Sequence, residues 1–307
     1  MAEVAHTPVL LAEVLAQLSV DPAGTYVDCT FGRGGHARGI LARLGPSGRL
    51  LVIDRDREAI DAGMDLARQD RRVVAIHGAF GELEKHTAQA GIVGGVYGVL
   101  FDLGVSSPQL DDPERGFSFS RSGPLDMRMD RRGALSAARW LARARLEEIA
   151  KVLWRYGEER YARRIARAIV AERGVATLLT TDGLRDLITR VKPRAGRSID
   201  PATRSFQALR IFINDELGEL AQALPQALRL LRSRGRLAVI SFHSLEDRIV
   251  KRFLRDEARG GGAGESIMQH RAPALRLVCR PMRASAEEQR ANPRARSAVL
   301  RVAEKCA

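Results

Sequence analysis

The feature that most constrains the fold is a short apolar strand followed at once by a glycine-rich turn and a helix. The strand ends at Tyr26-Val27-Asp28, the turn is Gly32-Arg33-Gly34-Gly35, and the helix is expected over residues 36–44. Glycines let backbone N–H groups approach a ligand closely, and a helix N-terminus favours negative charge. The segment therefore predicts the front half of a nucleotide-type binding site.

The acid at the end of this strand helps to separate two kinds of ligand. The run from Gly32 to Ala37 fits the G-x-G-x-x-A pattern of dinucleotide sites, which is a weak signal on its own. Asp28-x-Thr30-x-Gly32-x-Gly34 instead resembles the acid-x-Gly-x-Gly-x-Gly turn of S-adenosylmethionine (SAM) methyltransferases, with Thr30 replacing the first glycine. A carboxylate suits the ammonium group of SAM, whereas a pyrophosphate gains nothing from it. A plain structural turn, with Asp28 capping the helix, is the remaining alternative for this segment.

Three more buried strands are expected, and a residue that can face a ligand follows each of them. The expected strands are 49–54, 72–76 and 96–101. Their alternation with helices predicts an α/β fold with a doubly wound parallel sheet, in which ligands bind beyond the carboxyl ends of the strands. Asp54 is placed to accept hydrogen bonds from a ribose. Phe80 is placed either against an adenine or in the core, and Asp102 opens a polar loop.

The strand–helix alternation stops after the fourth strand and resumes near residue 216. Helical segments without strands fill the middle of the chain. We therefore expect a discontinuous SAM-binding domain of residues 1–112 and 216–307, and an inserted helical domain of residues 113–215 for substrate recognition. In the resumed part a strand at 236–242 leads to His243, and the last strands are expected at 275–279 and 298–303.

The charge of the chain predicts an anionic partner. The 307 residues include 50 Lys and Arg against 37 Asp and Glu, a net charge of +13, which is typical of proteins that bind nucleic acid. Phe117, Phe119 and Trp154 are candidates to hold an unstacked base, although core packing is the expected use of Trp154. The arginines expected to contact phosphate are Arg163, Arg164, Arg167, Arg194, Arg197, Arg204 and Arg210.

Composition also excludes several classes of protein. The three cysteines lie far apart in the sequence, so neither a disulfide framework nor a metal site is expected. No apolar run approaches the roughly 20 residues that span a membrane, and no signal peptide is recognisable. The chain is therefore expected to act in the cytoplasm.

Seven blocks of the sequence form an ordered set that runs from near the start of the chain almost to its end. The blocks are 6–10, 30–36, 53–56, 102–109, 123–130, 241–247 and 292–297. Together they closely resemble the RsmH (MraW) family of bacterial 16S rRNA (cytosine-N4)-methyltransferases. The resemblance implies a SAM-dependent enzyme that methylates N4 of one cytidine in the decoding region of 16S rRNA. It also implies a Rossmann-like class I SAM methyltransferase fold with an inserted helical domain, and the small ribosomal subunit as partner.

Carried over position by position, the resemblance implies a set of SAM contacts. They are Gly34, Gly35, His36, Asp54, Phe80, Asp102 and Gln109. Of these, His36 and Gln109 come from the resemblance alone.

The catalytic groups are less well defined, because the loop after the fourth strand lacks the Asn/Ser/Asp-Pro-Pro-aromatic motif of many DNA amino-methyltransferases. Acceptors that hold the amine hydrogens would favour a pyramidal nitrogen and stabilise its developing positive charge. Asp102, Ser106 and Ser107 are the candidates for that role. Asp102, Asp126 and His243 are the candidates to take the proton.

Three other functions are compatible with parts of the sequence. A SAM methyltransferase for a small molecule is opposed by the net charge, and a nicotinamide oxidoreductase is opposed by Asp28. A non-catalytic RNA-binding or ribosome-assembly protein that retains a SAM pocket is the third. Sequence does not distinguish a monomer from a homodimer.

Overall fold

The chain forms two compact units. The computed structural model describes residues 8–174, 179–192, 200–261 and 272–307. One unit comprises Met1–Gly104 with Leu217–Ala307, and the other comprises Val105–Glu216. The sequence analysis placed the insert at 113–215. Each unit is described by itself.

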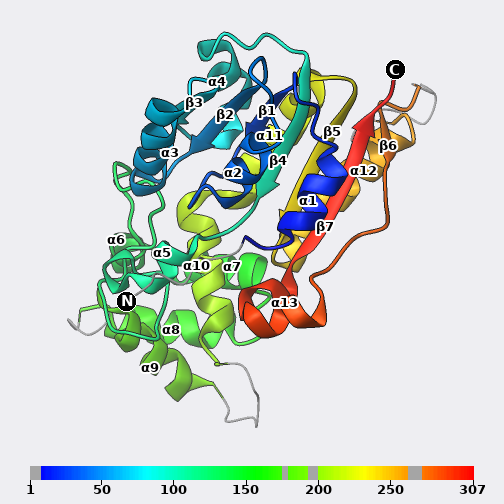
Figure 1. Cartoon of the computed structure of the whole chain (residues 1–307). Helices are drawn as coiled ribbons and strands as arrows, with labels where there is room; N and C mark the ends of the chain where they lie inside the picture. Colours follow the sequence, from blue (N-terminus) through cyan, green and yellow to red (C-terminus); the bar gives the residue numbers. More distant parts are fainter. Residues whose placement is uncertain (1–7, 175–178, 193–199, 262–271) are drawn as a thin grey trace. The chain divides into compact units, whose positions relative to one another are not determined.

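A seven-stranded sheet forms the centre of the first unit, in the order β3-β2-β1-β4-β5-β7-β6 (Figure 1). Strands β1 to β5 are parallel, and β7 is antiparallel to both β5 and β6. The expected doubly wound, mostly parallel sheet is therefore confirmed. The strands are β1 (Thr25–Asp28), β2 (Arg49–Asp54), β3 (Val73–His77), β4 (Val96–Asp102), β5 (Leu231–Ser241), β6 (Leu275–Leu277) and β7 (Val299–Lys305).

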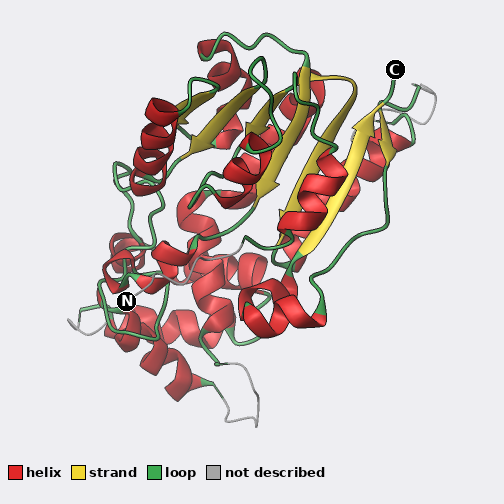
Figure 2. Ribbon diagram, in the orientation of Figure 1, coloured by secondary structure: helices red, strands yellow, loops and turns green. Residues whose placement is uncertain are grey.

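Helices cover both faces of this sheet (Figure 2). Alternate residues of β2 show why: Leu50 and Val52 belong to one apolar core, whereas Leu51 and Ile53 belong to the other. Such strands, apolar on both faces, must be buried on both sides. The first core includes residues of α1 (Leu11–Leu18), α2 (Gly35–Leu41) and α3 (Arg57–Gln69). The second includes residues of α4 (Leu83–Gln89), α11 (Glu216–Leu230) and α12 (Ser244–Ala258).

The order of the strands reverses between β1 and β4. From β1 the chain proceeds outward through β2 and β3, and then returns to place β4 on the other side of β1. In open α/β sheets the crevice at this reversal, outside the carboxyl ends of the strands, is where ligands bind. Asp28 ends β1 and Asp102 ends β4, so both acids lie at this position.

The second unit is helical around its own apolar core. In its described part the regular elements are α5 (Ser107–Asp111), a 3₁₀ turn (Pro113–Arg115), α6 (Ala137–Arg143), α7 (Leu146–Gly157), α8 (Ala162–Glu172), α9 (Thr181–Val191) and α10 (Thr203–Asn214). The irregular stretch before α6 is fixed by buried polar groups. Asn214 donates to the Met127 carbonyl at 2.7 Å and accepts from the Met129 N–H at 2.8 Å.

Two helices differ from the sequence expectation. Helix α1 begins at Leu11, because Leu10 has a φ of 56° and its N–H donates to Oε1 of Glu288, on α13 (Ala286–Ala291), at 2.7 Å. From the sequence this helix was expected to open at Thr7-Pro8 with Thr7 as its cap. Thr7 lies outside the described residues. Pro225, which from the sequence was expected to kink or split the helix over residues 216–233, lies within a single α11, so the helix is not split there. Among the described residues we find no helix with the length and hydropathy needed to cross a membrane.

Candidate active site

The turn after β1 requires glycine for two separate reasons. Gly32 and Gly34 have φ values of 54° and 73°, in the left-handed region that side chains rarely adopt. A Cβ on Gly34 would lie 2.5 Å from Cζ of Phe31, and one on Gly35 would lie 2.1 Å from Cγ of Pro8. The turn is therefore packed beneath the segment that precedes α1, and its backbone is held close to its neighbours.

Two side chains fasten this turn to the ends of adjacent strands. Asp54 accepts from the Gly32 N–H through Oδ2 and from the Asp56 N–H through Oδ1, both at 2.8 Å. Thr30 accepts from the Asp102 N–H through Oγ1 at 2.7 Å. Thr30, which replaces a glycine of the pattern, thus ties the turn to β4. Burial raises the pKa of Asp54 to about 6, although its two backbone N–H donors oppose the shift.

Asp28 is a buried acid with one unsatisfied oxygen. It is 1% exposed, and Oδ1 accepts from the Thr30 N–H at 3.1 Å. Oδ2 is buried and has no hydrogen-bond partner among the described residues. Burial raises the pKa of Asp28 to about 6. An unpaired carboxylate oxygen is costly to bury, so the site is suited to a cationic or hydrogen-bond-donating ligand.

His36 links the preceding segment to Asp102. Its ring is 5% exposed, with Nε2 3.1 Å from the Val9 carbonyl and Nδ1 3.5 Å from Oδ2 of Asp102. A carbonyl only accepts, so Nε2 carries a proton. Burial alone would lower the pKa of His36, but Asp102, together with the charge of Asp28 and the Val9 carbonyl, raises it. The other oxygen of Asp102, Oδ1, is buried without a hydrogen-bond partner in the described part of the chain.

Phe80 follows β3 in a 3₁₀ turn (Phe80–Glu82) that is held by α11. Its ring packs edge-on against Phe101 with centroids 5.6 Å apart, and it is only partly buried. Glu219 accepts from the Gly81 N–H at 2.7 Å, and Gln226 donates to the Gly81 carbonyl at 2.5 Å. Sequence reasoning missed both α11 residues, because no local pattern joins positions so far apart in the chain.

The remaining expected SAM contact, Gln109, lies in the second unit with the two serines. Oε1 of Gln109 accepts from the Ser106 N–H at 2.9 Å, in a capping box at the start of α5. Gln109 is 5% exposed, and Ser107 is the first residue of α5. The amide of Gln109 thus fixes the first turn of this short helix.

His243 serves as the N-cap of α12. Its Nδ1 accepts from the Glu246 N–H at 3.3 Å, and Nε2 lies 3.1 Å from Oε1 of Glu246 but without hydrogen-bond geometry. Because Nδ1 uses its lone pair in the cap, Nε2 bears the proton of the neutral ring. Neither nitrogen then offers a lone pair to a substrate.

Asp126, the third candidate base, is paired within the second unit. Arg128 donates to Oδ1 through Nε at 2.6 Å and to Oδ2 through Nη2 at 2.7 Å. Burial favours a higher pKa for Asp126, but these bonds and the charge of Arg128 outweigh it and lower the pKa. Of the three candidates, Asp102 is the one that has a buried oxygen without a partner.

The three aromatic candidates have different surroundings. Phe117 is buried at 6% exposure, and Phe119 packs against Phe206 with ring centroids 4.8 Å apart. Trp154 is 63% exposed, so the expectation that it packs in the core is wrong. Periodicity explains this position, because Trp154 is one turn from Lys151 of α7 and from Glu158, the C-cap of this helix, and both are exposed.

Comparison with known proteins identifies full-length relatives. A family model described as the MraW methylase family matches residues 3–306. A protein of Methylococcus capsulatus named ribosomal RNA small subunit methyltransferase H is 55% identical over 298 residues, covering 96% of this chain and 99% of its own. A protein of Nitrosococcus oceani with the same name is 54% identical over 304 residues, covering 98% and 96%. The crystal structure of an rRNA methylase from Streptococcus thermophilus aligns over 100% of both chains, with a TM-score of 0.43 and 10% identity.

Proposed function

The chain belongs to the MraW methylase family and is a SAM-dependent methyltransferase, and we propose that it methylates N4 of one cytidine in the decoding region of 16S rRNA. The observation that carries this proposal is the full-length identity of 55% to a relative named for small-subunit rRNA methylation. The net charge of +13 supports an RNA substrate over a small molecule. A small-subunit substrate would also place the enzyme in the cytoplasm.

The residues around the glycine turn fit SAM. The buried, unpartnered Oδ2 of Asp28 would accept from the ammonium group, and Asp54 would accept from the ribose hydroxyls. Asp102, at the end of β4, would line the same pocket. Phe80 would lie against the adenine, while Gly34, Gly35 and His36 would line the turn. Gln109 remains a proposed SAM contact on the basis of the resemblance. When bound, SAM supplies an activated methyl group on a sulfonium, which is an intrinsically good leaving group.

The protein's own contribution would be position and electrostatics. Cytosine N4 is a poor nucleophile because its lone pair is delocalised into the ring. Asp102 would accept an amine hydrogen through Oδ1, favour pyramidal nitrogen and then take the proton. Ser106 and Ser107 would orient the amine. We no longer favour Asp126 or His243 as bases, since Arg128 and the α12 cap engage them.

The second unit, Val105–Glu216, would recognise the RNA. Its described part is helical, carries its own apolar core and presents arginines to solvent. The assignment as a substrate domain follows the division expected from the sequence at 113–215.

The test uses small ribosomal subunits from cells that lack the modification. Purified protein is incubated with these subunits and methyl-labelled SAM, and the labelled nucleoside is identified after digestion. Label in N4-methylated cytidine would support cofactor, substrate and reaction together. Label elsewhere would refute the proposed target, and SAM binding without any label would favour a binding or assembly role.

Variants of Asp102 separate chemistry from binding. Asp102→Asn keeps an acceptor oxygen but cannot take a proton, and Asp102→Ala removes both. We expect Asp102→Ala to abolish methylation with RNA affinity unchanged within a few-fold. Turnover equal to wild type in that variant would remove Asp102 from the proposed site.

A further inference from the structure

We propose that the corner between α7 and α8 binds a single-stranded RNA segment, with Trp154 stacked on an unpaired base and the arginines of α8 on phosphates. This surface, the α7–α8 corner, comprises Trp154 on α7, Arg160 and Tyr161 in the connection that follows it, and Arg163, Arg164 and Arg167 on α8. Figure 1 shows the two helices. The inference rests on the proposed RNA substrate and names the part of the protein that would contact it.

Trp154 is the largest apolar side chain left open to solvent in the described part of this unit. It is 63% exposed, and Tyr161, just before α8, is 37% exposed. The other tryptophan is placed differently: Trp140 packs against Phe212 with ring centroids 4.5 Å apart. Exposing an indole to water forfeits a large burial energy. A free aromatic face is what an unstacked RNA base requires.

The arginines of α8 lie on the face opposite its core. Ile165 and Ile169 are fully buried, whereas Arg163, Arg164 and Arg167 are exposed. At spacings of one, three and four residues these arginines share one side of the helix. Within the described residues none of the three has an ion pair or a hydrogen bond from its side chain.

Other arginines of the same unit have acidic partners. Arg185 pairs with Asp200 at 2.8 Å, Arg190 with Glu172 at 2.7 Å and Arg210 with Glu216 at 2.8 Å. Arg210, expected from the sequence to contact phosphate, is therefore already neutralised. Arg194 and Arg197 lie outside the described residues. The exposed arginines of α8, in contrast, have no acidic partner among the described residues.

Backbone hydrogen bonds fix the turn that follows Trp154 and leads to α8. Glu158 ends α7 in a left-handed conformation, and its N–H donates to the Trp154 carbonyl at 3.0 Å. The Glu159 N–H donates to the Leu153 carbonyl at 3.2 Å, and Arg204 of α10 donates to the Glu158 carbonyl at 3.2 Å. Arg204 thus adds another cation beside this turn.

A buried ion pair also holds the turn after α7. Nζ of Lys192 lies 2.7 Å from Oε2 of Glu159, and the two side chains are 10% and 3% exposed. This ion pair and the backbone bonds therefore restrain the short connection that follows Trp154. A positive surface with aromatic groups on a fixed frame is the common design of single-strand binding sites.

Fluorescence tests the stacking directly. In Trp140→Phe the remaining indole is Trp154, and in the matched Trp154→Phe it is Trp140. The ligand is a single-stranded oligoribonucleotide of about 12 nucleotides, a typical single-strand site size. We expect it to quench the tryptophan fluorescence of Trp140→Phe and not that of Trp154→Phe.

Kinetics test whether the contact serves the substrate. Trp154→Ala should raise KM for the small subunit about tenfold, as expected for one stacked base, with kcat and SAM affinity unchanged. Trp154→Phe should restore most of the affinity, because phenylalanine also stacks. A general folding defect would instead change kcat or SAM affinity.

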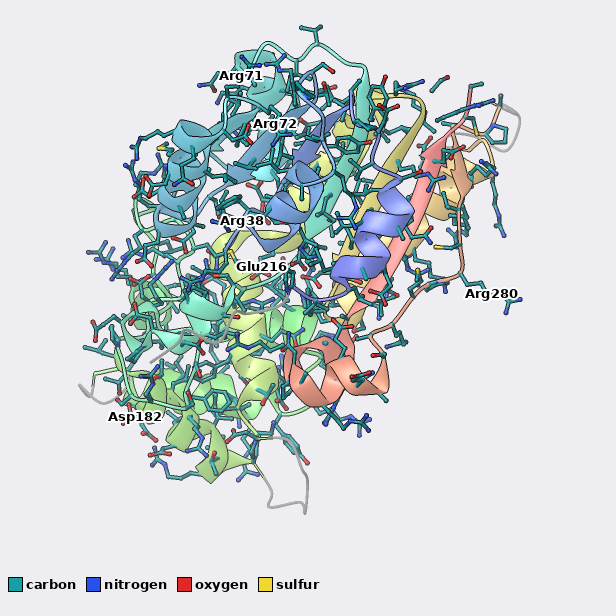
Figure 3. All side chains as sticks on the ribbon, in the orientation of Figure 1. Arg38, Arg71, Arg72, Asp182, Glu216 and Arg280 are labelled. Atoms are coloured by element: carbon teal, nitrogen blue, oxygen red, sulfur yellow. The ribbon has the colours of Figure 1, made fainter. Side chains whose placement is uncertain are left out.

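Salt dependence tests the arginines. Each phosphate contact on a single strand contributes about 0.7 to the slope of log K against log salt, so Arg163→Gln with Arg167→Gln should reduce the slope by about 1.4. The matched control is Arg71→Gln with Arg280→Gln, which removes the same charge from exposed arginines of the first unit (Figure 3). The control should leave the slope within about 0.3 of wild type.

The outcomes separate this inference from the proposed function. Unquenched Trp154 with an unchanged KM in Trp154→Ala would overturn the inference, even if the wild-type enzyme methylates cytidine. If the α8 double variant and its control give equal slopes of log K against log salt, the proposed role of the α8 arginines is overturned. Quenching without any methylation by the wild type would support the surface and refute the proposed reaction.

Discussion

Nδ1 of His36 lies 3.5 Å from Oδ2 of Asp102, while Nε2 of the same ring faces the Val9 carbonyl at 3.1 Å. Since Nε2 must carry a proton, only the doubly protonated ring offers an N–H to the carboxylate as well. The positive ring then offsets part of the charge of Asp102 and Asp28 when no ligand is bound.

The first prediction concerns the pH dependence of stability. The pKa of folded His36 lies above its ordinary value of 6.5, so its stabilising contribution is complete below pH 6.5 and is lost as pH rises through the folded pKa. His36→Asn should therefore remove a decline in the free energy of unfolding above about pH 6.5. Urea unfolding across this range measures it.

His86 supplies the control for this experiment. Burial lowers its pKa below 6.5, so its contribution has the opposite sign: it is complete above pH 6.5 and is lost as pH falls. His86→Asn should leave the decline above pH 6.5 in place. If the free energy of unfolding changes with pH in the same way in both variants, the His36–Asp102 interaction does not cause the decline above pH 6.5.

The second prediction is that a site acid reduces the stability of the protein without ligand. The pKa of Asp28 rises from 3.8 to about 6, so ionising it costs the folded state as pH rises through that range. Asp28→Asn should raise the free energy of unfolding at pH 7 by on the order of 1–3 kcal/mol, since a pKa shift of one unit is about 1.4 kcal/mol. It should also weaken SAM binding.

Asp65→Asn is the matched control, because Asp65 is an exposed acid on α3 paired with Arg68. Surface pairs contribute about 0–1 kcal/mol, so neither stability nor SAM affinity should change much. Calorimetric titration measures the SAM affinity, and urea unfolding measures the free energy of unfolding. A loss of stability in Asp28→Asn would show that the acid is satisfied without ligand.

The third prediction separates backbone strain from steric overlap at the turn. Gly34 and Gly94 have nearly equal φ values of 73° and 74°, but a Cβ on Gly94 would have no neighbour within 4 Å. Gly94→Ala should cost about 1 kcal/mol of strain. Gly34→Ala should cost 1–3 kcal/mol more, as overpacking does, and should abolish measurable SAM binding. Similar losses in the two variants would contradict the packed turn.

The fourth prediction concerns the support of Phe80 by α11. Glu219→Ala leaves the Gly81 N–H without its acceptor, and an orphaned buried donor costs about 1–3 kcal/mol. SAM affinity should fall several-fold, whereas Glu219→Gln should retain most of it. Glu84→Ala removes a surface pair with Arg229 and should be neutral. If SAM affinity is unchanged in Glu219→Ala, the Phe80–Glu82 turn does not contribute to SAM binding.

Strands β2 and β4 were predictable because each is an apolar run with clear limits, whereas β5 begins at Leu231, before the strand expected at 236–242. The expected bounds of β2, residues 49–54, are those in the structure. Helix α12 was not predicted, because its cap is His243, outside the usual Ser, Thr, Asp and Asn set. Trp154 was misplaced because residue type was weighted above its position on a polar helix face.

The site was predictable where chemistry follows a strand end. Asp28, Asp54 and Asp102 could be grouped because carboxyl ends of parallel strands meet at one edge. Contacts across long separations, such as Glu219 with Gly81, depend on packing that no local pattern encodes. The roles of Thr30 in tying the turn to β4 and of the Val9 carbonyl in orienting His36 likewise emerge only from the folded geometry.

The bond between the Leu10 N–H and Glu288 spans 278 residues, which bears on when the site can form during synthesis. A ribosome makes the glycine turn and its acids early, but makes Glu288 and β7 last. Until then Leu10 lacks its acceptor, and β5 lacks its neighbour. Cofactor binding should therefore be acquired late, after most of the chain has emerged, so that nascent fragments sequester little SAM.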